Sequence, residues 1–598
     1  MSANQSRRLV DSGPSPVSST TRPNIDTPMP YPGRELAQDS MRLVEIEPAT
    51  HESDPVVCTL RDVAFGSRPE FEALSYRWGT EPANDTITLN GCRFEVKKNL
   101  LDALLFLRRR VAPRSARQSF WIDAICINQR DVSERNSQLR IMGQIYFRAD
   151  TVVVWLGSEY TKFQKEKMGE LKPNEGEKPE EDTSSHDNSI QKKMVRELRT
   201  DPYWDRLWII QEIAQANKLR VCFGDESFSW KRFMHLIAMH HSDGNTGPLR
   251  LDRQLREEKY NDSLTLKRLL EEHGQAKCLD PRDKVYGLVG LASDAAEFPM
   301  DYSKSLYEVW KDTMVYMNQW KLFKEESQIL TVGALVKSLL MEKYGDPLSQ
   351  ILKEHEDHVD STQLIDNPTD SLVFCLEAIS LGCILCVGPS ASDVVLSPRQ
   401  ASGWRTEIQR FFPADELVPA HREYDEMLRA LLKSNDSEVE TMCFNRPSTV
   451  VWKLQRQNSP WYVDRYHGGY QRRVATAASQ LPRTPQQAAD RLASVQPRLY
   501  LASQFPDRTP RKMGVASGLV QPSDLVCWVR SSRRALLVRV VEEDDWCAKV
   551  RVLGTALATE DMRGSTPDLA QRWMSLREDA GARFQVQLDA DTIFMLLE

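Results

Sequence analysis

Residues 120–157 constrain the fold of this chain more than any other stretch, because strand, helix and strand signals follow one another there without a gap. The run FWIDAICI, residues 120–127, is apolar with Asp123 as its only charge. It stops at Asn128 and Gln129, which are poor strand formers and common in loops. We therefore expect a buried strand over residues 120–127 that ends in a polar loop.

A capped amphipathic helix is expected directly after this strand. Asp131 and Glu134 form the Asp-x-x-Glu pattern of a helix N-cap. Apolar residues then recur at steps of three and four, which places them on one face of a helix that packs on a sheet: Leu139, Met142, Ile145, Tyr146 and Ala149. The run TVVVWLG, residues 151–157, predicts a second buried strand. A strand-helix-strand unit of this kind builds a site at one edge of a sheet.

The remaining segments differ in character. At 598 residues the chain exceeds what one hydrophobic core supports, so we expect two or three folded units. Residues 1–40 are rich in Ser, Pro and Asn and predict a disordered tail, while the charged residues 162–189 predict a mobile insertion. Residues 295–498 predict a mainly helical middle region. The short alternating apolar runs of residues 499–598 predict a small β-rich C-terminal module.

Two local signals make sharper predictions. Residues 86–96, TITLNGCRFEV, predict a β-hairpin, because Asn90 and Gly91 supply the positive φ angles of a tight primed turn. Residues 371–388, SLVFCLEAISLGCILCVG, are apolar but short for a membrane span and carry Glu377. We interpret this second run as a core helix.

Composition argues against several functional classes. A net charge of −7 offers no concentration of Lys and Arg for a phosphate backbone, so we expect no nucleic-acid partner. The N-terminus lacks a signal-peptide core, and eleven scattered cysteines are typical of reduced thiols, which predicts a cytoplasmic protein with no membrane span. No phosphate-binding glycine loop, Gly-x-Ser-x-Gly elbow or zinc-ligand spacing is present. The sequence therefore predicts no metal and no bound cofactor.

Polar residues near strand ends form a first candidate site. In a parallel or mixed α/β sheet, ligands bind beyond the carboxyl ends of the strands. The candidate substrate-binding residues at these ends are Ser75, Arg77 and Trp78 of the run SYRWG, together with Asp123 and Asn128. The alternatives are that Asp123 is a turn or helix-capping acid and that Trp78 is a core aromatic.

Glu212 is the sharpest chemical candidate. On a helical wheel Trp208 and Glu212, four residues apart, share a stripe that points largely away from the apolar face of Leu207, Ile210, Ile213 and Ala214. A tryptophan beside a carboxylate that faces off the core suits a ligand surface. The structural alternative pairs Glu212 with an arginine such as Arg206 and lets Trp208 seal a domain contact.

Four ordered blocks of the chain resemble the fungal heterokaryon incompatibility (HET) domain: residues 71–80, 89–104, 120–157 and 203–214. The run DPRDKVYGLVGLASD, residues 280–294, looks like a segment that usually follows that domain. The resemblance covers about the first half of the chain and is weak in the last hundred residues. It implies an α/β HET domain over residues 41–294, with a TIR-like or flavodoxin-like fold and a mostly parallel sheet.

The resemblance also implies a function, nonself recognition between fungal cells in which the HET domain triggers cell death. Trp208 and Glu212 look like the TIR-domain element that carries a catalytic glutamate, which implies NAD as a substrate, Glu212 as the carboxylate at its ribose and Trp208 as a stacking wall. The alternative is a non-catalytic scaffold that signals by assembly, through self-association or with other incompatibility proteins. Catalysis requires Glu212 to open onto a crevice, whereas a scaffold could leave it buried.

Overall fold

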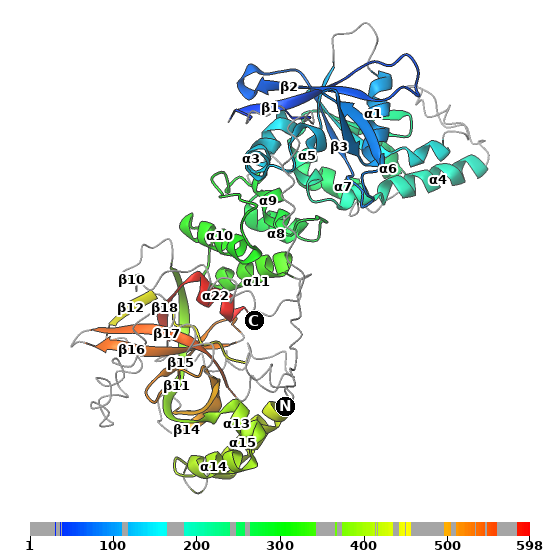
Figure 1. Ribbon diagram of the computed structural model, residues 1–598. Helices are drawn as coiled ribbons and strands as arrows, with labels where there is room; N and C mark the ends of the chain where they lie inside the picture. The colour runs from blue at the N-terminus through cyan, green and yellow to red at the C-terminus, as the bar shows by residue number, and fades with distance from the viewer. Residues whose placement is uncertain are drawn as a thin grey trace, which may run out of the picture. The chain divides into compact units, whose positions relative to one another are not determined.

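The computed structural model divides into two compact units (Figure 1). The first comprises Met1–Gln138, Arg148–Ile190 and Asn217–Phe233, and the second comprises Leu139–Phe147, Gln191–Ala216 and Met234–Glu598. The described residues are 30–31, 36–37, 39–110, 118–163, 185–239, 247–257, 264–341, 365–366, 373–412, 414, 417–433, 442–448, 450–455, 496–503, 510–532, 534–543, 547–558 and 583–597. Most of the predicted tail (1–40) and of the predicted insertion (162–189) lies outside them.

A nine-stranded mixed sheet organises the first unit, in the order β5-β4-β2-β1-β6-β3-β7-β8-β9. Its strands are β1 (Ser40–Ile46), β2 (Val57–Ala64), β3 (Glu72–Tyr76), β4 (Asp85–Leu89), β5 (Cys92–Val96), β6 (Ser119–Trp121), β7 (Thr151–Gly157), β8 (Leu219–Phe223) and β9 (Glu226–Ser229). Strands β6, β3, β7 and β8 are neighbours and run parallel. Every residue of β7 is buried, as its uniformly apolar sequence predicts.

The prediction of a mostly parallel sheet is wrong for this unit, although the α/β class is confirmed. Within the described residues of this sheet, four strand pairings are parallel and four are antiparallel. The antiparallel pairings flank the parallel centre, because β1 and β2 pair antiparallel on one side and β9 folds back on β8 on the other. The parallel strand ends that can build a ligand site are therefore those of β6, β3, β7 and β8.

The hairpin prediction is confirmed. Strands β4 and β5 pair antiparallel from Asp85↔Val96 to Leu89↔Cys92, and Asn90 and Gly91 form the turn with φ angles of +52° and +79°. Positive φ at both central residues is the geometry that matches the twist of the two strands. The Asn90 side chain also accepts a hydrogen bond from the backbone N–H of Leu60 at 2.8 Å.

The strand predicted over residues 120–127 is correct only at its start. Strand β6 ends at Trp121, and the next turn of chain is the short helix α2 (Asp123–Cys126). A short apolar run does not distinguish a buried strand from a buried helical turn, and Asp123 suits the positive end of a helix. The strand therefore ends six residues earlier than expected, at Trp121 and not at residue 127.

The capped helix after this turn is confirmed. Helix α3 (Val132–Arg148) begins after Asp131, whose carboxylate accepts the backbone N–H of Glu134 at 3.1 Å. Four residues of the predicted apolar face are buried, and the fifth, Leu139, is half-buried: Met142, Ile145, Tyr146 and Ala149. The other helices that precede the second sheet are α1 (Lys98–Arg110), α4 (Ser185–Arg199), α5 (Ile209–Gln215), α6 (Trp230–Met239), α7 (Gly247–Asp252), α8 (Leu266–His273), α9 (Asp283–Val289), α10 (Leu306–Gln319) and α11 (Ser327–Met341).

A second sheet lies in the second unit. Its order is β10-β12-β17-β14-β13-β11-β15-β16, and β17 also pairs with β16, so six antiparallel strands close into a ring. The bounds are β10 (Ile365–Asp366), β11 (Phe374–Ser390), β12 (Val450–Gln455), β13 (Arg498–Ser503), β14 (Pro510–Ala516), β15 (Leu525–Val529), β16 (Ala535–Glu543), β17 (Cys547–Ala558) and β18 (Arg583–Leu588), which pairs with β11. The predicted C-terminal β-strands are thus present, but the sheet also takes β10, β11 and β12 from residues 295–498, which were expected to be mainly helical.

The run predicted as a core helix over residues 371–388 is instead the long strand β11, and that prediction is wrong. It pairs with β13, β15 and β18, so it lies at the centre of the second sheet. Its burial alternates from Phe374 to Ser380, which is the period of a strand. Glu377, the charge that disfavoured a membrane span, lies opposite Gln585 and within 3.7 Å of Arg583. No helix in the described ranges is long and apolar enough to span a membrane.

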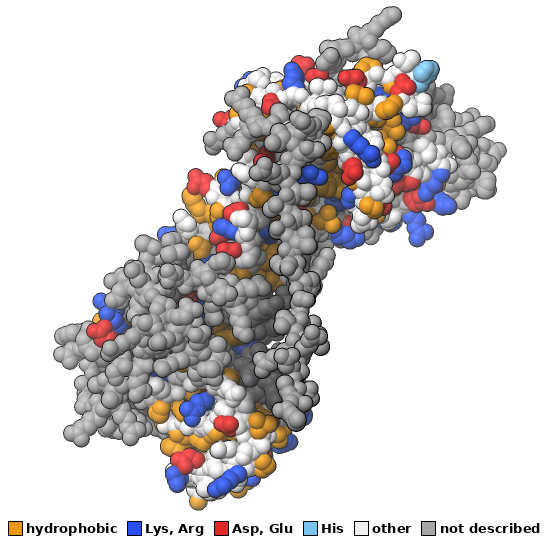
Figure 2. Space-filling view, viewed as in Figure 1, with side chains coloured by type: hydrophobic (Ala, Val, Ile, Leu, Met, Phe, Trp, Pro, Cys, Tyr) orange, Lys and Arg blue, Asp and Glu red, His pale blue; other side chains and the backbone are white. Residues whose placement is uncertain are grey.

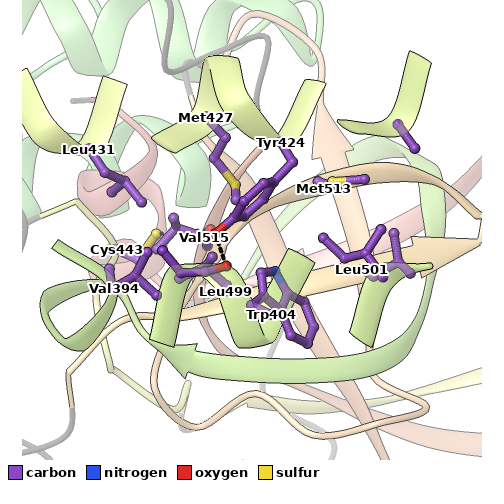
Figure 3. Packing of buried hydrophobic residues seen from close by; sticks show 14 residues of the cluster. Val394, Trp404, Tyr424, Met427, Leu431, Cys443, Leu499, Leu501, Met513 and Val515 are labelled. Atoms are coloured by element: carbon purple, nitrogen blue, oxygen red, sulfur yellow. Dashed lines mark hydrogen bonds between the residues drawn. The ribbon is translucent and has the colours of Figure 1, made fainter. Parts of the chain in front are cut away.

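Two cores form on opposite faces of strands β13 and β14. Tyr500 and Ala502 point to one side, where residues of all six ring strands form the interior of the closed sheet. Leu499 and Leu501 point to the other side and pack with the helices α13 (Ala391–Leu396), α14 (Pro398–Ile408) and α15 (Leu417–Lys433), as Figure 3 shows. Helix α22 (Ala590–Leu596) follows β18. On the described part of the face in Figure 2, acidic and basic side chains are interspersed.

Candidate functional site

The first candidate site is the carboxyl edge of the parallel strands in the first unit. Trp78 follows β3 and Asp123 follows β6, and the Trp78 indole Nε1 donates to the Asp123 carboxylate at 2.9 Å. The chain turns directly after Trp78 at Gly79, whose φ of +72° is readily adopted only by glycine. The structure therefore joins two of the predicted site residues. The backbone N–H of Ala124 also donates to this carboxylate, at 2.7 Å, so Asp123 is hydrogen-bonded within the first turn of α2 as well.

Arg77 is anchored at the end of the neighbouring strand β7. Its guanidinium lies 2.7 Å from the carboxylate of Glu159 and donates to the carbonyl of Leu156 at 3.4 Å. Asn99 of α1 donates to the Arg77 carbonyl at 2.7 Å and accepts from the indole of Trp155 at 3.1 Å. Asn99 thus ties helix α1 to two parallel strands, a role that the sequence interpretation missed.

Ser75 and Asn128 make contacts within the fold. Ser75 is buried within β3. The backbone N–H of Asn128 donates to the Glu134 carboxylate at 2.7 Å, and its side-chain oxygen accepts from the Arg130 N–H at 3.3 Å. Asn128 therefore shapes the turn between α2 and α3.

Arg42 and Glu134 lie at the centre of this turn. The Arg42 guanidinium pairs with both Glu134 oxygens, donates to the carbonyl of Cys126 at 3.3 Å and lies over the ring of Tyr31. The sequence interpretation assigned Glu134 only to the helix cap and overlooked Arg42. The sequence feature that could have revealed this ion pair is an arginine inside the mostly apolar run MRLVEI.

A cavity of about 430 Å³ opens at the ends of β7 and β8 in the same unit. Its wall combines residues after these strands with residues of α1 and of the loop between β1 and β2: Trp155, Ser158, Thr161, Gly224, Asp225, Asp102, Leu105, Arg108, Arg109 and residues 48–52. None of the predicted site residues lies in this wall. The cavity is nevertheless at the edge where ligands of such sheets bind.

The polar groups of this cavity are held in place by one another. Asp102 accepts from the Ser158 hydroxyl at 2.7 Å and pairs with Lys98 at 2.6 Å. Arg108 is buried and donates to backbone carbonyls of the loop, including that of Glu52 at 2.8 Å. Arg109 lies 3.0 Å from Asp225. A cavity with fixed charges of both signs suits a polar small molecule.

Glu212 and Trp208 belong to the second unit and lie apart in sequence from this edge. Glu212 is only 2% exposed, and its neighbour Gln211 is 1% exposed. The expectation that Glu212 faces away from the core is therefore wrong. Helix α5 is short and buried nearly all round, since residues 209–214 are all buried.

Trp208 is held by an aspartate that the sequence interpretation did not single out. The Trp208 indole donates to the Asp283 carboxylate at 3.1 Å, and the Tyr302 hydroxyl donates to its other oxygen at 2.6 Å. Arg282 next to Asp283 pairs with Asp280 at 2.8 Å. These charged residues lie in the run DPRDKVYG, which resembles a segment that usually follows the HET domain. That run was the sequence feature from which Asp283 could have been identified.

Cys126, in the short helix α2 beside Asp123, is a fully buried thiol. Burial raises the pKa of the Cys126 thiol to about 12, so the group is protonated at neutral pH and is not a nucleophile. No group of three or more His, Cys, Asp and Glu side chains that could hold a metal ion occurs among the residues that the structure describes.

Comparisons with known proteins agree with these blocks. The family model described as heterokaryon incompatibility protein (HET) matches residues 71–212. Heterokaryon incompatibility protein 6, OR allele, of Neurospora crassa is 28% identical over 374 residues, which cover 49% of this chain and 54% of that protein. The chain thus spans about half the length of this curated relative. No solved structure matches the chain. Strands β3, β6 and β7 and helices α1 to α3 lie within the matched segment, so this part of the chain is similar to the HET family.

Proposed function

We propose that this chain acts in heterokaryon incompatibility, as a cytoplasmic protein whose HET domain triggers cell death when cells of different type fuse. The match of residues 71–212 to the HET family and the similarity to an incompatibility protein of Neurospora crassa support this role. Both similarities cover half of the chain or less. Neither identifies the partner that sets off the response, so the partner is part of the proposal. That partner is another incompatibility protein or a second copy of this chain.

The burial of Glu212 supports signalling by assembly over catalysis. A carboxylate that stabilises positive charge at a ribose must touch the substrate. Glu212 is 2% exposed, and the indole of Trp208, the expected stacking wall, is engaged by Asp283. This arrangement fits a carboxylate and a tryptophan that hold the fold together while other surfaces recruit partners.

NAD cleavage is the second candidate, favoured by the spacing of Trp208 and Glu212 at one end of α5. It requires a rearrangement that exposes Glu212 and releases Trp208 from Asp283. Self-association is the event that would supply it. If Glu212 contributes to NAD cleavage, each tenfold loss of the cleavage rate in a Glu212 variant corresponds to about 1.4 kcal/mol of lost transition-state stabilisation.

Glu212→Gln separates the two candidates, because it preserves size and removes the charge. The measurements are NAD loss and thermal melting of the purified chain, and the death response on overexpression in fungal cells. Assembly predicts no NAD loss by the wild-type protein and a death response that follows the amount of folded variant. Glu271→Gln, at an exposed residue of α8, is the matched control. NAD loss that disappears in a stably folded Glu212→Gln protein would reject the assembly candidate.

A further inference from the structure

A cavity of about 680 Å³ in the second unit is separate from the sites described above. It is bounded by the turn between α10 and α11, the start of β11, and parts of β12 and β18. Phe323, Ile329 and Trp452 contribute apolar wall. Three lysines also line it: Lys321, Lys324 and Lys453. Their ammonium groups form no hydrogen bond or ion pair with any residue in the described part of the chain.

Lys321 occupies a position where glycine would be more stable. Helix α10 ends in a Schellman motif, in which the N–H of Leu322 donates to the Met317 carbonyl at 2.8 Å and the N–H of Lys321 donates to the Asn318 carbonyl at 3.1 Å. The residue at the turn, Lys321, has a φ of +55°. A side chain in this left-handed region costs stability that glycine does not. The lysine places a charge at the cavity despite this cost.

Lys453 also lowers local stability, through repulsion between like charges. It lies directly opposite Lys549 in the pairing of β12 with β17, and like charges directly opposite each other destabilise a sheet. Lys549 is compensated by Glu542 at 2.8 Å. Within the described ranges, Lys453 has no such carboxylate.

The two glutamates at the cavity are occupied by the fold. The carboxylate of Glu326 accepts from the backbone N–H of Glu377 at 2.9 Å and from the Gln585 side chain at 3.2 Å. Glu325 accepts from the Ser327 hydroxyl at 3.2 Å, at the start of α11. Both acids lie just before the positive end of that helix. The cavity therefore holds three ammonium groups and two carboxylates, and neither carboxylate pairs with one of the three lysines in the described part of the chain.

We propose that this cavity binds a small anion that carries a planar aromatic ring, the chemistry of a nucleoside monophosphate. Lysine ammonium groups bind phosphate as point charges, and the half-buried Phe323 offers surface for a ring. The volume falls within the roughly 300–1,000 Å³ of small-molecule sites. Residues that conflict with local stability concentrate at functional sites, and two of the three lysines do so. The proposal does not depend on the role in incompatibility.

Calorimetric titration of the full chain tests the proposal, with the four ribonucleoside 5′-monophosphates, adenosine and inorganic phosphate as probes. At least one monophosphate should bind about tenfold more tightly than adenosine or phosphate alone, and its affinity should fall with added salt. Lys453→Gln should weaken that binding about threefold to tenfold. The absence of heat with all four monophosphates at millimolar concentration would overturn the proposal.

Lys321→Gly gives the sharper result, because affinity and stability should move in opposite directions. Removing the left-handed strain should raise Tm by about 2 °C, while loss of the charge should lower affinity about threefold or more. Ser531→Gly is the matched control, since Ser531 has a φ of +70° and does not line the cavity. It should raise Tm and leave affinity unchanged. Equal affinity in wild type, Lys321→Gly and Lys453→Gln would place the ligand elsewhere and overturn the assignment.

Cys375 supplies an independent readout. It lines the cavity and is exposed, whereas Cys278 is half-buried and does not line it. A bound monophosphate should slow alkylation of Cys375 by iodoacetamide and leave Cys278 unaffected. Unchanged alkylation of Cys375 at a saturating monophosphate concentration would contradict the proposed location.

Discussion

Arg42 and Glu134 form a buried ion pair that joins strand β1 to the start of helix α3. Arg42 is 1% exposed and Glu134 is 8% exposed, and two guanidinium nitrogens meet two carboxylate oxygens. Glu134 also accepts the backbone N–H of Asn128. The pair therefore holds the loop that presents Asp123 to Trp78.

Arg42→Met should destabilise the first unit by about 3–5 kcal/mol, because it leaves a buried carboxylate without its cation. Chemical denaturation followed by circular dichroism measures the change. The double variant Arg42→Met with Glu134→Leu should recover part of the loss, since no buried charge remains. Arg61→Met is the control, because that side chain is 55% exposed. A single variant as stable as the control would contradict a structural role for the pair.

Trp208→Phe should destabilise the second unit by about 1.5–3 kcal/mol, because the indole N–H that donates to the buried Asp283 carboxylate is lost. Phenylalanine keeps one six-membered aromatic ring, so part of the apolar contact of the indole is retained. Thermal melting measures the effect. Trp320→Phe, at a tryptophan that is 49% exposed, should change Tm far less. Equal melting of the two variants would mean that the Asp283 contact contributes little.

Features set by local chemistry were predictable from the sequence. The turn at Asn90 and Gly91 and the cap at Asp131 depend on residues a few positions apart, and both are found. The prediction that polar residues at the carboxyl ends of parallel strands meet also holds for Trp78 and Asp123, because β3 and β6 are parallel neighbours.

Features set by distant contacts were not predictable. Arg42 and Glu134 are 92 residues apart, and Asp102 and Ser158 are 56 apart, so no local pattern marks either pair. The wheel of α5 failed for the same reason. A helical wheel separates an apolar side from a polar side, but it cannot show that distant segments of the chain cover both sides. Glu212 is buried because both sides of α5 are covered.

Apolar runs were the other source of error. The residues after Trp121 form a helical turn and residues 374–390 form a strand, the reverse of the two expectations. In both runs the side chains are apolar enough to be buried in either conformation. The pairing partners of β11 decide the outcome, and they come from strands more than a hundred residues later.

Ile145→Asp should unfold the region around α3, because Ile145 is fully buried and an unpaired buried charge costs several kcal/mol, on the order of a domain's whole stability. Gln144→Asp places the same charge at the exposed neighbouring position of the helix and should remain soluble. Soluble yield and Tm of the two variants give the comparison. Similar yields would mean that this face of α3 is not a core face.

His273 should make the second unit sensitive to mild acid. Burial lowers the pKa of this imidazole from 6.5 to about 4, while Glu272, Arg250 and Arg268 are the charged groups that act on it. The unfolded chain therefore binds a proton near pH 6.5 that the folded chain does not bind until near pH 4. Stability that is present above pH 6.5 is lost as the pH falls through this window, by up to about 3 kcal/mol. His273→Gln should flatten this part of the stability profile, measured by urea denaturation from pH 7.5 to 4.5. Parallel profiles for wild type and variant would show that another group drives the acid sensitivity.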